Sequence, residues 1–183
     1  MDSSILTTEN FWDYTGKTKG NHWDFTRFNP KHFQHIENCI HRLGELGIEA
    51  DLIMMHPYDR WGFSQMTKEQ DDLYWNYAVA RFSAFANVWW SLANEYDLMP
   101  HKAIQDWERY ASILCEKDPY HHMRSIHNCV SLYDFSRPWI THCSVQRTDL
   151  YKSSEITNEL RERYHKPVVL DEIAYEGDIQ HGW

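Results

Sequence analysis

The chain has 183 residues, 42% of them hydrophobic and 25% charged, which suits one globular domain with a sizeable core and excludes a disordered protein. Its formal net charge of −9, from 27 acidic and 18 basic residues, argues against a nucleic-acid partner, because phosphate binding needs clustered Lys and Arg. No apolar run approaches the roughly 20 residues that cross a bilayer, so no membrane partner is expected.

Residues 1–28 show neither a helical nor a strand period and are expected to form a loop or lead-in segment before a single domain over 29–183. Asn29 suits a helix N-cap, and Pro30 suits the first helical position. Apolar residues then recur at spacings of three and four and predict one face of a helix that ends near Gly47. These residues are Phe33, Ile36, Ile40 and Leu43.

Short apolar runs alternate with helical segments along the rest of the chain. The expected strands are 50–55, 87–92, 124–128, 139–143 and 167–170. A capping box at 67–70 opens a second helix, whose expected inward residues are Leu73, Tyr77, Phe82 and Phe85. Further helices are expected over 101–116 and 153–164. This alternation is typical of parallel βα units.

Polar residues stand where the expected strands end. They are His56, Asn94, Glu95, His127, Asn128, His142, Asp171 and Glu172. Side chains gathered after the carboxyl ends of parallel strands are typical of a barrel enzyme, although a doubly wound sheet also binds ligands there. A nucleotide cradle is not expected, because the chain has only seven glycines and no Gly-rich loop after a strand.

Two of these strand ends deliver carboxylates suited to cleaving a glycosidic bond. Such hydrolysis needs one carboxyl group to protonate the departing oxygen and a second to attack or stabilise the anomeric carbon. Glu95 and Glu172 are the candidates, although Glu95 could instead be an acidic residue that stabilises a helix start. Strand alternation predicts that Asp171 and Glu172 point to opposite faces, so that only one of them faces the site.

The aromatic content also favours sugars. Nine Trp and eleven Tyr offer rigid apolar faces with a polar edge, although many of these rings are expected in the core. The four cysteines lie in apolar or helical segments and are expected to be buried free thiols. Residues 1–4 lack a basic segment followed by an apolar one, which predicts no secretory signal and a cytoplasmic location.

Four segments together resemble one large clan of retaining (β/α)8-barrel glycoside hydrolases, and most of all its cellulase-like and apiosidase-like bacterial members. They are WSLANEYD at 90–97, KPVVLDEIAYEGD at 166–178, HPYDRWGF at 56–63 and THCSVQ at 141–146. In that clan an Asn-Glu pair closes the fourth strand and a Glu closes the seventh. The resemblance therefore implies an α/β fold that is part of a TIM barrel, about strands 3 to 7, within a larger barrel.

The resemblance implies a retaining glycosidase in which Glu95 is the acid/base and Glu172 the nucleophile, with Asp171 and Glu176 as competitors for the second role. Asn94 would bond the sugar 2-hydroxyl. The other implied sugar-binding residues are His56, Asp59, Trp61, His127, His142, Gln146 and Tyr175. The substrate would be an oligosaccharide or polysaccharide, and neither a metal nor a cofactor is implied. The clan's Arg on the second strand and Trp on the eighth have no counterpart in this chain.

Two other functions stay open at this point. A metal-dependent hydrolase could use His56, His127 and His142, and a carbohydrate-binding barrel fragment could keep the aromatic cleft without turnover. The outermost strands of a partial barrel are also open to pairing, so a homo-oligomer joined through its sheet edges is a further expectation.

Overall fold

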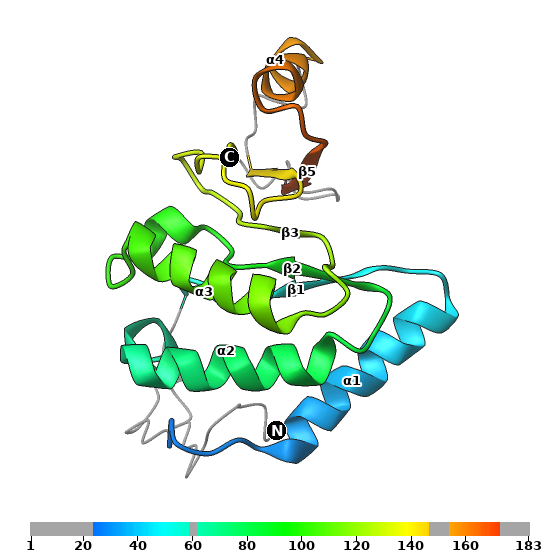
Figure 1. Cartoon of the computed structure of the whole chain (residues 1–183), viewed down its shortest axis with the longest axis vertical. Coiled ribbons are helices and arrows are strands. Elements are labelled where there is room, and N and C mark those ends of the chain that lie inside the picture. The colour runs from blue at the N-terminus through cyan, green and yellow to red at the C-terminus, as the bar shows by residue number, and fades with distance from the viewer. Residues whose placement is uncertain (1–23, 59–61, 147–153, 173–183) are drawn as a thin grey trace, which may run out of the picture. The chain divides into compact units, whose positions relative to one another are not determined.

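The computed structural model describes residues 24–58, 62–146 and 154–172, and its elements alternate between helices and short strands (Figure 1). The helices are α1 (Pro30–Glu45), α2 (Lys68–Phe82), α3 (Ile104–Lys117) and α4 (Ser154–Tyr164), with the 3-10 turns η1 (Phe63–Gln65) and η2 (Tyr96–Leu98). The strands are β1 (Ala50–Ile53), β2 (Val88–Ser91), β3 (Arg124–Ser125), β4 (Cys143–Gln146) and β5 (Val168–Glu172). No helix in these ranges is long and apolar enough to span a membrane.

The strands form a three-stranded sheet in the order β1-β2-β3 and a two-stranded sheet of β4 and β5. β2 pairs with β3 in parallel, and β4 pairs with β5 in parallel. Isolated backbone hydrogen bonds continue this pairing past the strand ends, from the Asn94 amide to the Met55 carbonyl and from the His127 amide to the Ala93 carbonyl. The predicted parallel βα pattern is therefore present.

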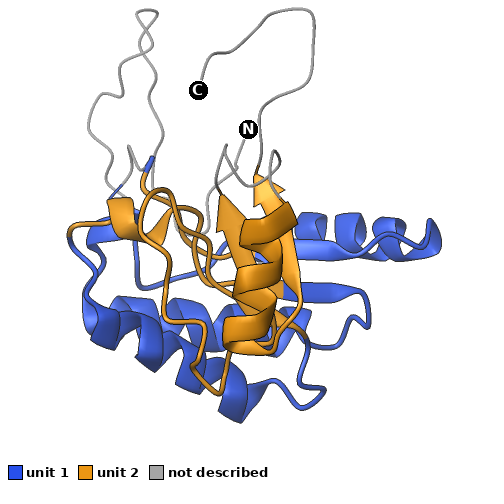
Figure 2. Ribbon diagram, turned by 90° about the horizontal axis from the view of Figure 1, so that it is seen from above, with its two compact units in different colours: residues 1–52, 58–89, 101–122 blue, residues 53–57, 90–100, 123–183 orange. Residues whose placement is uncertain are grey.

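The chain divides into two compact units, coloured separately in Figure 2. Unit 1 comprises residues 1–52, 58–89 and 101–122, and unit 2 comprises residues 53–57, 90–100 and 123–183. In unit 1, α2 packs against α3, and the Trp75 ring stacks on Tyr110 with centroids 4.9 Å apart. Unit 1 thus has its own aromatic core.

The predicted starts of α1 and α2 are confirmed. The Asn29 side chain accepts a hydrogen bond from the Lys31 amide, and Pro30 opens the helix. Thr67 and Gln70 exchange the two hydrogen bonds of a capping box, of 2.8 and 3.4 Å. Local side-chain chemistry is therefore sufficient to place these helix starts.

The predicted inward face of α2 is wrong in part. Leu73 is 41% exposed, whereas Tyr74, Trp75, Ala78 and Val79 are buried. The buried face also holds Asp71, which is 1% exposed because Lys102 and Tyr110 of the same unit bind its carboxylate. A charged residue on the inward face weakens the apolar period from which the face was predicted.

The expectation of buried cysteines holds only for Cys143. Cys39 is exposed, and Cys115 and Cys129 are half-buried. Cys39 lies on the outer side of α1, where Phe33 and Ile40 are the residues turned into the core. Apolar neighbours in the sequence are therefore not sufficient to bury Cys39 on this helix.

In unit 2, the strand predicted at 139–143 lies later in the chain, at Cys143–Gln146. Trp139 and Ile140 belong to a turn, in which the Ile140 amide donates to the Arg137 carbonyl. Both side chains are buried, at 7% and 2% exposure, and Trp139 packs edge-on against Tyr133. Burial of a turn thus produced an apolar run that resembles a strand.

α4 packs against β5 in unit 2 and completes the βα alternation there. Phe135 packs edge-on against Tyr164 at the end of this helix, and the Lys166 ammonium donates to the carbonyls of Phe135 and Arg137. These contacts anchor the amino end of β5. The last described residues of this strand are Asp171 and Glu172, within the strand rather than after it.

Candidate active site

Glu95 lies four residues after the end of β2 and is the N-cap of η2. It is 2% exposed and has a φ of +48°, a left-handed conformation that non-glycine residues seldom adopt. Two backbone hydrogen bonds hold the flanking residues: the Asn94 amide donates to Met55, and the Tyr96 amide donates to the His127 carbonyl. The backbone thus fixes the position of the Glu95 carboxylate at the end of the strand.

Asp97 in η2 joins this turn to the segment after β3. Its carboxylate accepts hydrogen bonds from the amides of Cys129, Val130 and Ser131, at 2.7 to 2.8 Å. Burial raises the pKa of Asp97, but the main-chain donors outweigh it, and the net pKa lies below the ordinary value. The ionised carboxylate therefore holds the segment next to Glu95.

Cys129 contacts the predicted acid/base directly. Burial and a hydrogen bond to Glu95 raise the pKa of the Cys129 thiol to about 11, and the charge of Glu172 contributes to the same shift. The thiol thus stays protonated near neutral pH and donates to the Glu95 carboxylate.

His127 connects three other residues that end the strands of unit 2. Its Nδ1 lies 2.9 Å from Asp171 Oδ1, while its Nε2 lies 2.9 Å from Gln146 Oε1 and 3.3 Å from Glu172 Oε2. Burial lowers the pKa of His127, but the hydrogen bond and charge of Asp171, with Gln146 and Glu172, leave it above the ordinary value. The imidazole ring therefore lies between two carboxylates, which favour its protonated form.

The expectation that Asp171 and Glu172 face opposite ways is wrong. Ser144 pairs with Val169 and Gln146 pairs with Glu172, so β5 advances three residues while β4 advances two. The extra residue is a β-bulge, which interrupts the alternation of side chains along the strand. Both carboxylates can consequently reach the same imidazole ring.

Both oxygens of Asp171 are engaged by neighbouring side chains. Oδ1 faces His127, and Oδ2 accepts a hydrogen bond from the Ser144 hydroxyl. Burial raises the pKa of Asp171, but the His127 and Ser144 contacts lower it below the ordinary value overall. Asp171 is thus an ionised carboxylate with a supporting position behind His127.

Side chains also brace β3 against β4, which share no strand ladder. The Asn128 amide group donates to the Gln146 carbonyl and accepts from the Gln146 amide, at 3.2 and 3.3 Å. Ser125 donates to the His142 carbonyl at 2.6 Å. The Asn128 side chain therefore pairs with the Gln146 backbone as a neighbouring strand would, and this pairing holds Gln146 beside His127.

Of the predicted site residues, the structure brings together Glu95, His127, Gln146 and Glu172, with Asn94 adjacent in sequence. His56 follows β1 and is half-buried. His142 precedes β4, so its predicted place at a carboxyl strand end is wrong, and burial lowers its pKa. Asp59, Trp61, Tyr175 and Glu176 lie outside the described residues.

Sequence reasoning missed Asp97, Cys129 and Ser144 as parts of the site. Asp97 stands two residues after Glu95, and Cys129 stands two after His127, so their nearness to the motif residues was the available signal. Each of these three residues contacts a side chain or backbone group that is 27 or more residues away in the sequence. Their roles therefore depend on tertiary contacts.

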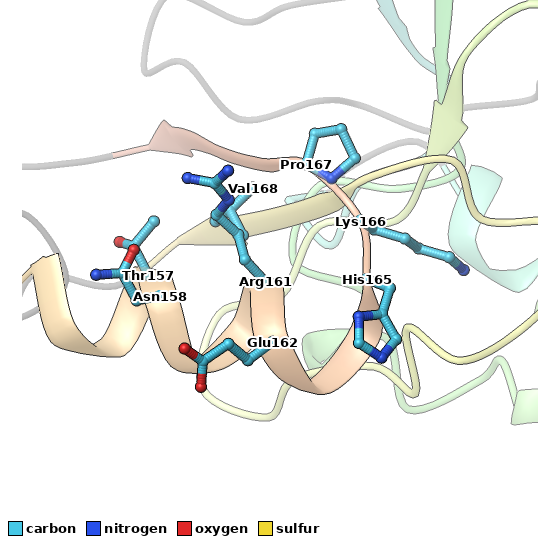
Figure 3. A pocket seen from close by; sticks show the side chains of 8 residues that line it. All are labelled: Thr157, Asn158, Arg161, Glu162, His165, Lys166, Pro167 and Val168. Carbon is cyan, nitrogen blue, oxygen red and sulfur yellow. The ribbon is translucent and has the colours of Figure 1, made fainter.

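A hollow of about 930 Å³ lies along α4 and the amino end of β5 (Figure 3). Residues of α4, of the link 165–167 and the first residue of β5 line it, and the set is Thr157, Asn158, Arg161, Glu162, His165, Lys166, Pro167 and Val168. This hollow is at the amino end of β5, whereas Asp171 and Glu172 are at its carboxyl end. The hollow is therefore separate from the carboxylate site.

The histidines do not form a metal-binding cluster in the described parts of the chain, where no three His, Cys, Asp or Glu residues gather as ligands. Both ring nitrogens of His127 are within hydrogen-bonding distance of side-chain oxygens. A metal ligand needs a free nitrogen lone pair, and the oxygens on both sides favour protonation instead. The geometry around His127 thus supports a role in hydrogen bonding.

Comparisons with known proteins also indicate a glycoside hydrolase domain. Residues 3–183 match the apiosidase-like catalytic domain family. A candidate glycoside hydrolase from Bacteroides vulgatus has a similar structure, with a TM-score of 0.88 and 42% sequence identity over 98% of this chain and 35% of its own. No curated protein matches the sequence.

A glycoside hydrolase family 5 protein, also from Bacteroides vulgatus, is similar with a TM-score of 0.60 and 18% identity, over 94% of this chain and 42% of its own. At this identity the likeness concerns the fold, and it confirms the predicted mixed α/β class, part of a (β/α)8 barrel. The chain spans between a third and a half of the length of these two proteins. The match over nearly its whole length shows that the chain belongs to the apiosidase-like catalytic domain family.

Proposed function

We propose that this chain carries the catalytic carboxylates of a retaining glycoside hydrolase that cleaves an O-glycosidic bond in a glycan. Glu95 is the acid/base and Glu172 is the nucleophile. The observation that carries the proposal is the short segment from His127 to Cys129, which contacts both carboxylates. Cys129 bonds to Glu95, and His127 faces Glu172 at 3.3 Å. Residues 127–129 thus contact two carboxylates that come from different parts of the chain.

The mechanism has two steps. In the first, a Glu172 oxygen attacks the anomeric carbon while Glu95 donates its proton to the departing oxygen, which leaves a glycosyl ester on Glu172. In the second, Glu95 takes a proton from water as the water oxygen attacks the anomeric carbon and releases the Glu172 carboxylate. The sugar leaves with its original anomeric configuration, and neither a metal nor a cofactor takes part.

The surroundings of the acidic residues in β5 support Glu172 as the nucleophile. Asp171 has one oxygen against His127 and the other bound by Ser144, so an attack by either oxygen would break one of these contacts. The two side chains are equally exposed, at 21% for Glu172 and 20% for Asp171, so the distinction depends on these contacts. His127 would stabilise its charge before attack and after release.

The test is to trap the glycosyl-enzyme. A panel of 2-deoxy-2-fluoro glycosides with activated leaving groups slows the second step, so mass spectrometry of a digest should locate one added sugar on Glu172. Glu172→Gln should abolish both labelling and turnover of p-nitrophenyl glycosides. Asp134→Asn, which changes a 53% exposed carboxylate in the same unit, serves as the matched control.

Two results would count against the proposal. One is inversion of the anomeric centre, observed by NMR in the first product formed, because inversion requires a water rather than Glu172 as the attacking group. The other is full turnover by Glu172→Gln. Sugar binding that is equal in wild type and Glu172→Gln, without turnover in either, would instead indicate a carbohydrate-binding protein.

A further inference from the structure

The contact between His127 and Asp171 extends the site beyond the two carboxylates that would perform hydrolysis. His127 is 4% exposed, and each of its ring nitrogens faces a carboxylate or amide oxygen. A neutral imidazole carries a proton on one nitrogen only, so its other nitrogen would direct a lone pair at an oxygen. The imidazolium form satisfies both sides of the ring at once.

Among the residues that the structure describes, the charged groups in contact with the His127 ring belong to β5. β5 provides Asp171 and Glu172, both within 3.3 Å of the ring, while β4 provides the uncharged amide of Gln146. His142, before β4, has a pKa lowered by burial and adds no positive charge near neutral pH. Near η2, Glu95 contacts the Cys129 thiol, and Asp97 accepts hydrogen bonds from the backbone amides of residues 129–131.

We propose that Asp171 is a positioning residue for the nucleophile: it favours the protonated form of His127, whose Nε2–H lies between Gln146 Oε1 at 2.9 Å and Glu172 Oε2 at 3.3 Å and thereby orients the Glu172 carboxylate. This inference rests on the proposed function, in which Glu172 attacks the sugar. The order of contacts is Ser144 to Asp171, Asp171 to His127, and His127 to Glu172. The β-bulge in β5 makes the order possible, because it lets two consecutive residues reach one ring.

This arrangement would assist both steps of hydrolysis. During attack, a hydrogen bond to one Glu172 oxygen fixes the rotation of the carboxylate, so that the other oxygen can approach the anomeric carbon. During release, the carboxylate regains its negative charge, and a donor already in place stabilises that charge without rearrangement. Asp171 touches neither the sugar nor the reacting atoms, so it acts only through His127.

Asp171→Asn is the sharpest test, because it preserves the shape of the side chain and removes its charge. The Asn oxygen can still accept from the Nδ1–H of His127, which leaves Nε2 without a proton once the ring is neutral. A lone pair then faces Glu172, the same tautomer problem that a carboxylate-to-amide change causes in a Ser-His-Asp triad. We expect kcat/KM to fall by about ten- to a hundredfold at pH 7.5.

Acid pH should rescue this variant. Without the Asp171 charge the pKa of His127 drops, so the ring becomes protonated only in more acidic solution, where it again donates to Glu172. The loss relative to wild type should therefore shrink as the pH is lowered toward 5, and Asp134→Asn should show no pH-dependent difference. A residue with a purely structural role would lower activity by the same factor at each pH.

The titration of His127 can also be followed by NMR in the absence of substrate. In ¹⁵N-histidine-labelled full chain, with the His127 signals assigned by His127→Asn, wild type should titrate above pH 6.5 and Asp171→Asn below the wild-type value. Equal titration of His127 in both proteins overturns the proposal, and so does a pH-independent loss of activity. If Glu172→Gln keeps its activity, the proposed function fails, while the NMR titration still decides the Asp171–His127 contact separately.

Discussion

The backbone amide of Tyr96 donates to the carbonyl oxygen of His127 over 3.0 Å, and this bond joins the turn that carries Glu95 to the segment that faces Glu172. Tyr96 is the residue after the proposed acid/base, and its carbonyl partner belongs to the histidine beside the proposed nucleophile. The connection between the two carboxylates thus has a main-chain part, from Tyr96 to His127, and a side-chain part, from the His127 ring to Glu172 at 3.3 Å.

Glu95→Gln should slow turnover to an extent that depends on the leaving group. A glycoside with a poor leaving group needs protonation of the departing oxygen, so its hydrolysis should fall by about 10²- to 10⁴-fold, while an activated aryl glycoside should lose much less in its first step. Rates for a series of aryl glycosides with leaving groups of graded pKa measure this difference. An equal loss across the series would contradict the role of Glu95 as the acid.

Asp97→Asn should loosen the segment beside Glu95. The carboxylate accepts three main-chain hydrogen bonds, and since Asp97 is half-exposed and screened by water, we expect a loss of about 1–2 kcal/mol in the free energy of unfolding. The folded-state pKa of Asp97 is lowered, so its stabilisation is present above the unfolded pKa of about 3.9 and is lost as the pH falls through the lower folded value.

Urea unfolding of wild type and Asp97→Asn at pH 7 and at progressively more acidic pH tests this linkage. The difference between the two proteins should be largest near neutral pH and should shrink below about pH 4, where the wild-type carboxyl also becomes uncharged. Asp134→Asn again provides an exposed control. A difference that grows toward acid pH would mean that Asp97 is not held by donors to its charged form.

Local sequence signals were sufficient for the helices and for the strand ends that carry carboxylates. Asn29 with Pro30 and the box of Thr67 and Gln70 predicted helix starts that the structure confirms, because capping is decided by residues a few positions apart. The Asn-Glu pair is likewise predicted just beyond the end of a strand, and Glu95 lies four residues after the end of β2. Short-range chemistry determined both.

The other features depend on contacts that no short segment contains. The β-bulge next to Asp171 arises from the pairing of β5 with β4, and strand alternation in β5 alone predicted the wrong orientation. Trp139 and Ile140 are apolar because they bury a turn, which the sequence pattern could not distinguish from a strand. Such errors follow from treating burial as a property of secondary structure, when it is set by tertiary packing.

The reactivity of the cysteines should report on the contact between Cys129 and Glu95. Thiolate is the reactive form, so with pKa values of about 11, Cys129 and Cys143 should be alkylated by iodoacetamide at pH 7.5 on the order of a hundredfold more slowly than a free cysteine. Cys39, exposed on α1, should react first. Peptide mass spectrometry over time measures each site separately.

Glu95→Gln offers a direct control within the same experiment. The contact with Glu95 raises the pKa of the Cys129 thiol, so Glu95→Gln should lower that pKa and speed its alkylation, whereas Cys143, for which burial is the cause of the raised pKa, should keep its rate. An unchanged rate at Cys129 in this variant would argue against the hydrogen bond to Glu95. Acceleration at both cysteines would indicate general loosening of unit 2.

Lys102→Met should strongly destabilise unit 1. The Lys102 ammonium lies 2.6 Å from Asp71 Oδ2, and the side chains of the pair are only 3% and 2% exposed. Removing the ammonium leaves the buried Asp71 charge with the more distant Arg109 guanidinium, 3.6 Å away, which should cost about 3 kcal/mol in the free energy of unfolding. Burial already raises the pKa of Asp71 despite Lys102 and Tyr110, and without the ammonium this carboxyl should take up a proton even more readily.

Combining Lys102→Met with Asp71→Asn should recover much of that loss. The neutral amide avoids the buried charge, and its oxygen can still accept the hydrogen bond that Tyr110 gives to Asp71. Lys68→Met, at the exposed first position of α2, is the matched control for removing a lysine and should change the free energy of unfolding by less than about 0.5 kcal/mol. If urea unfolding finds the double variant no more stable than Lys102→Met alone, the cost lies in the lost contact of the ammonium with the Met66 carbonyl rather than in the charge on Asp71.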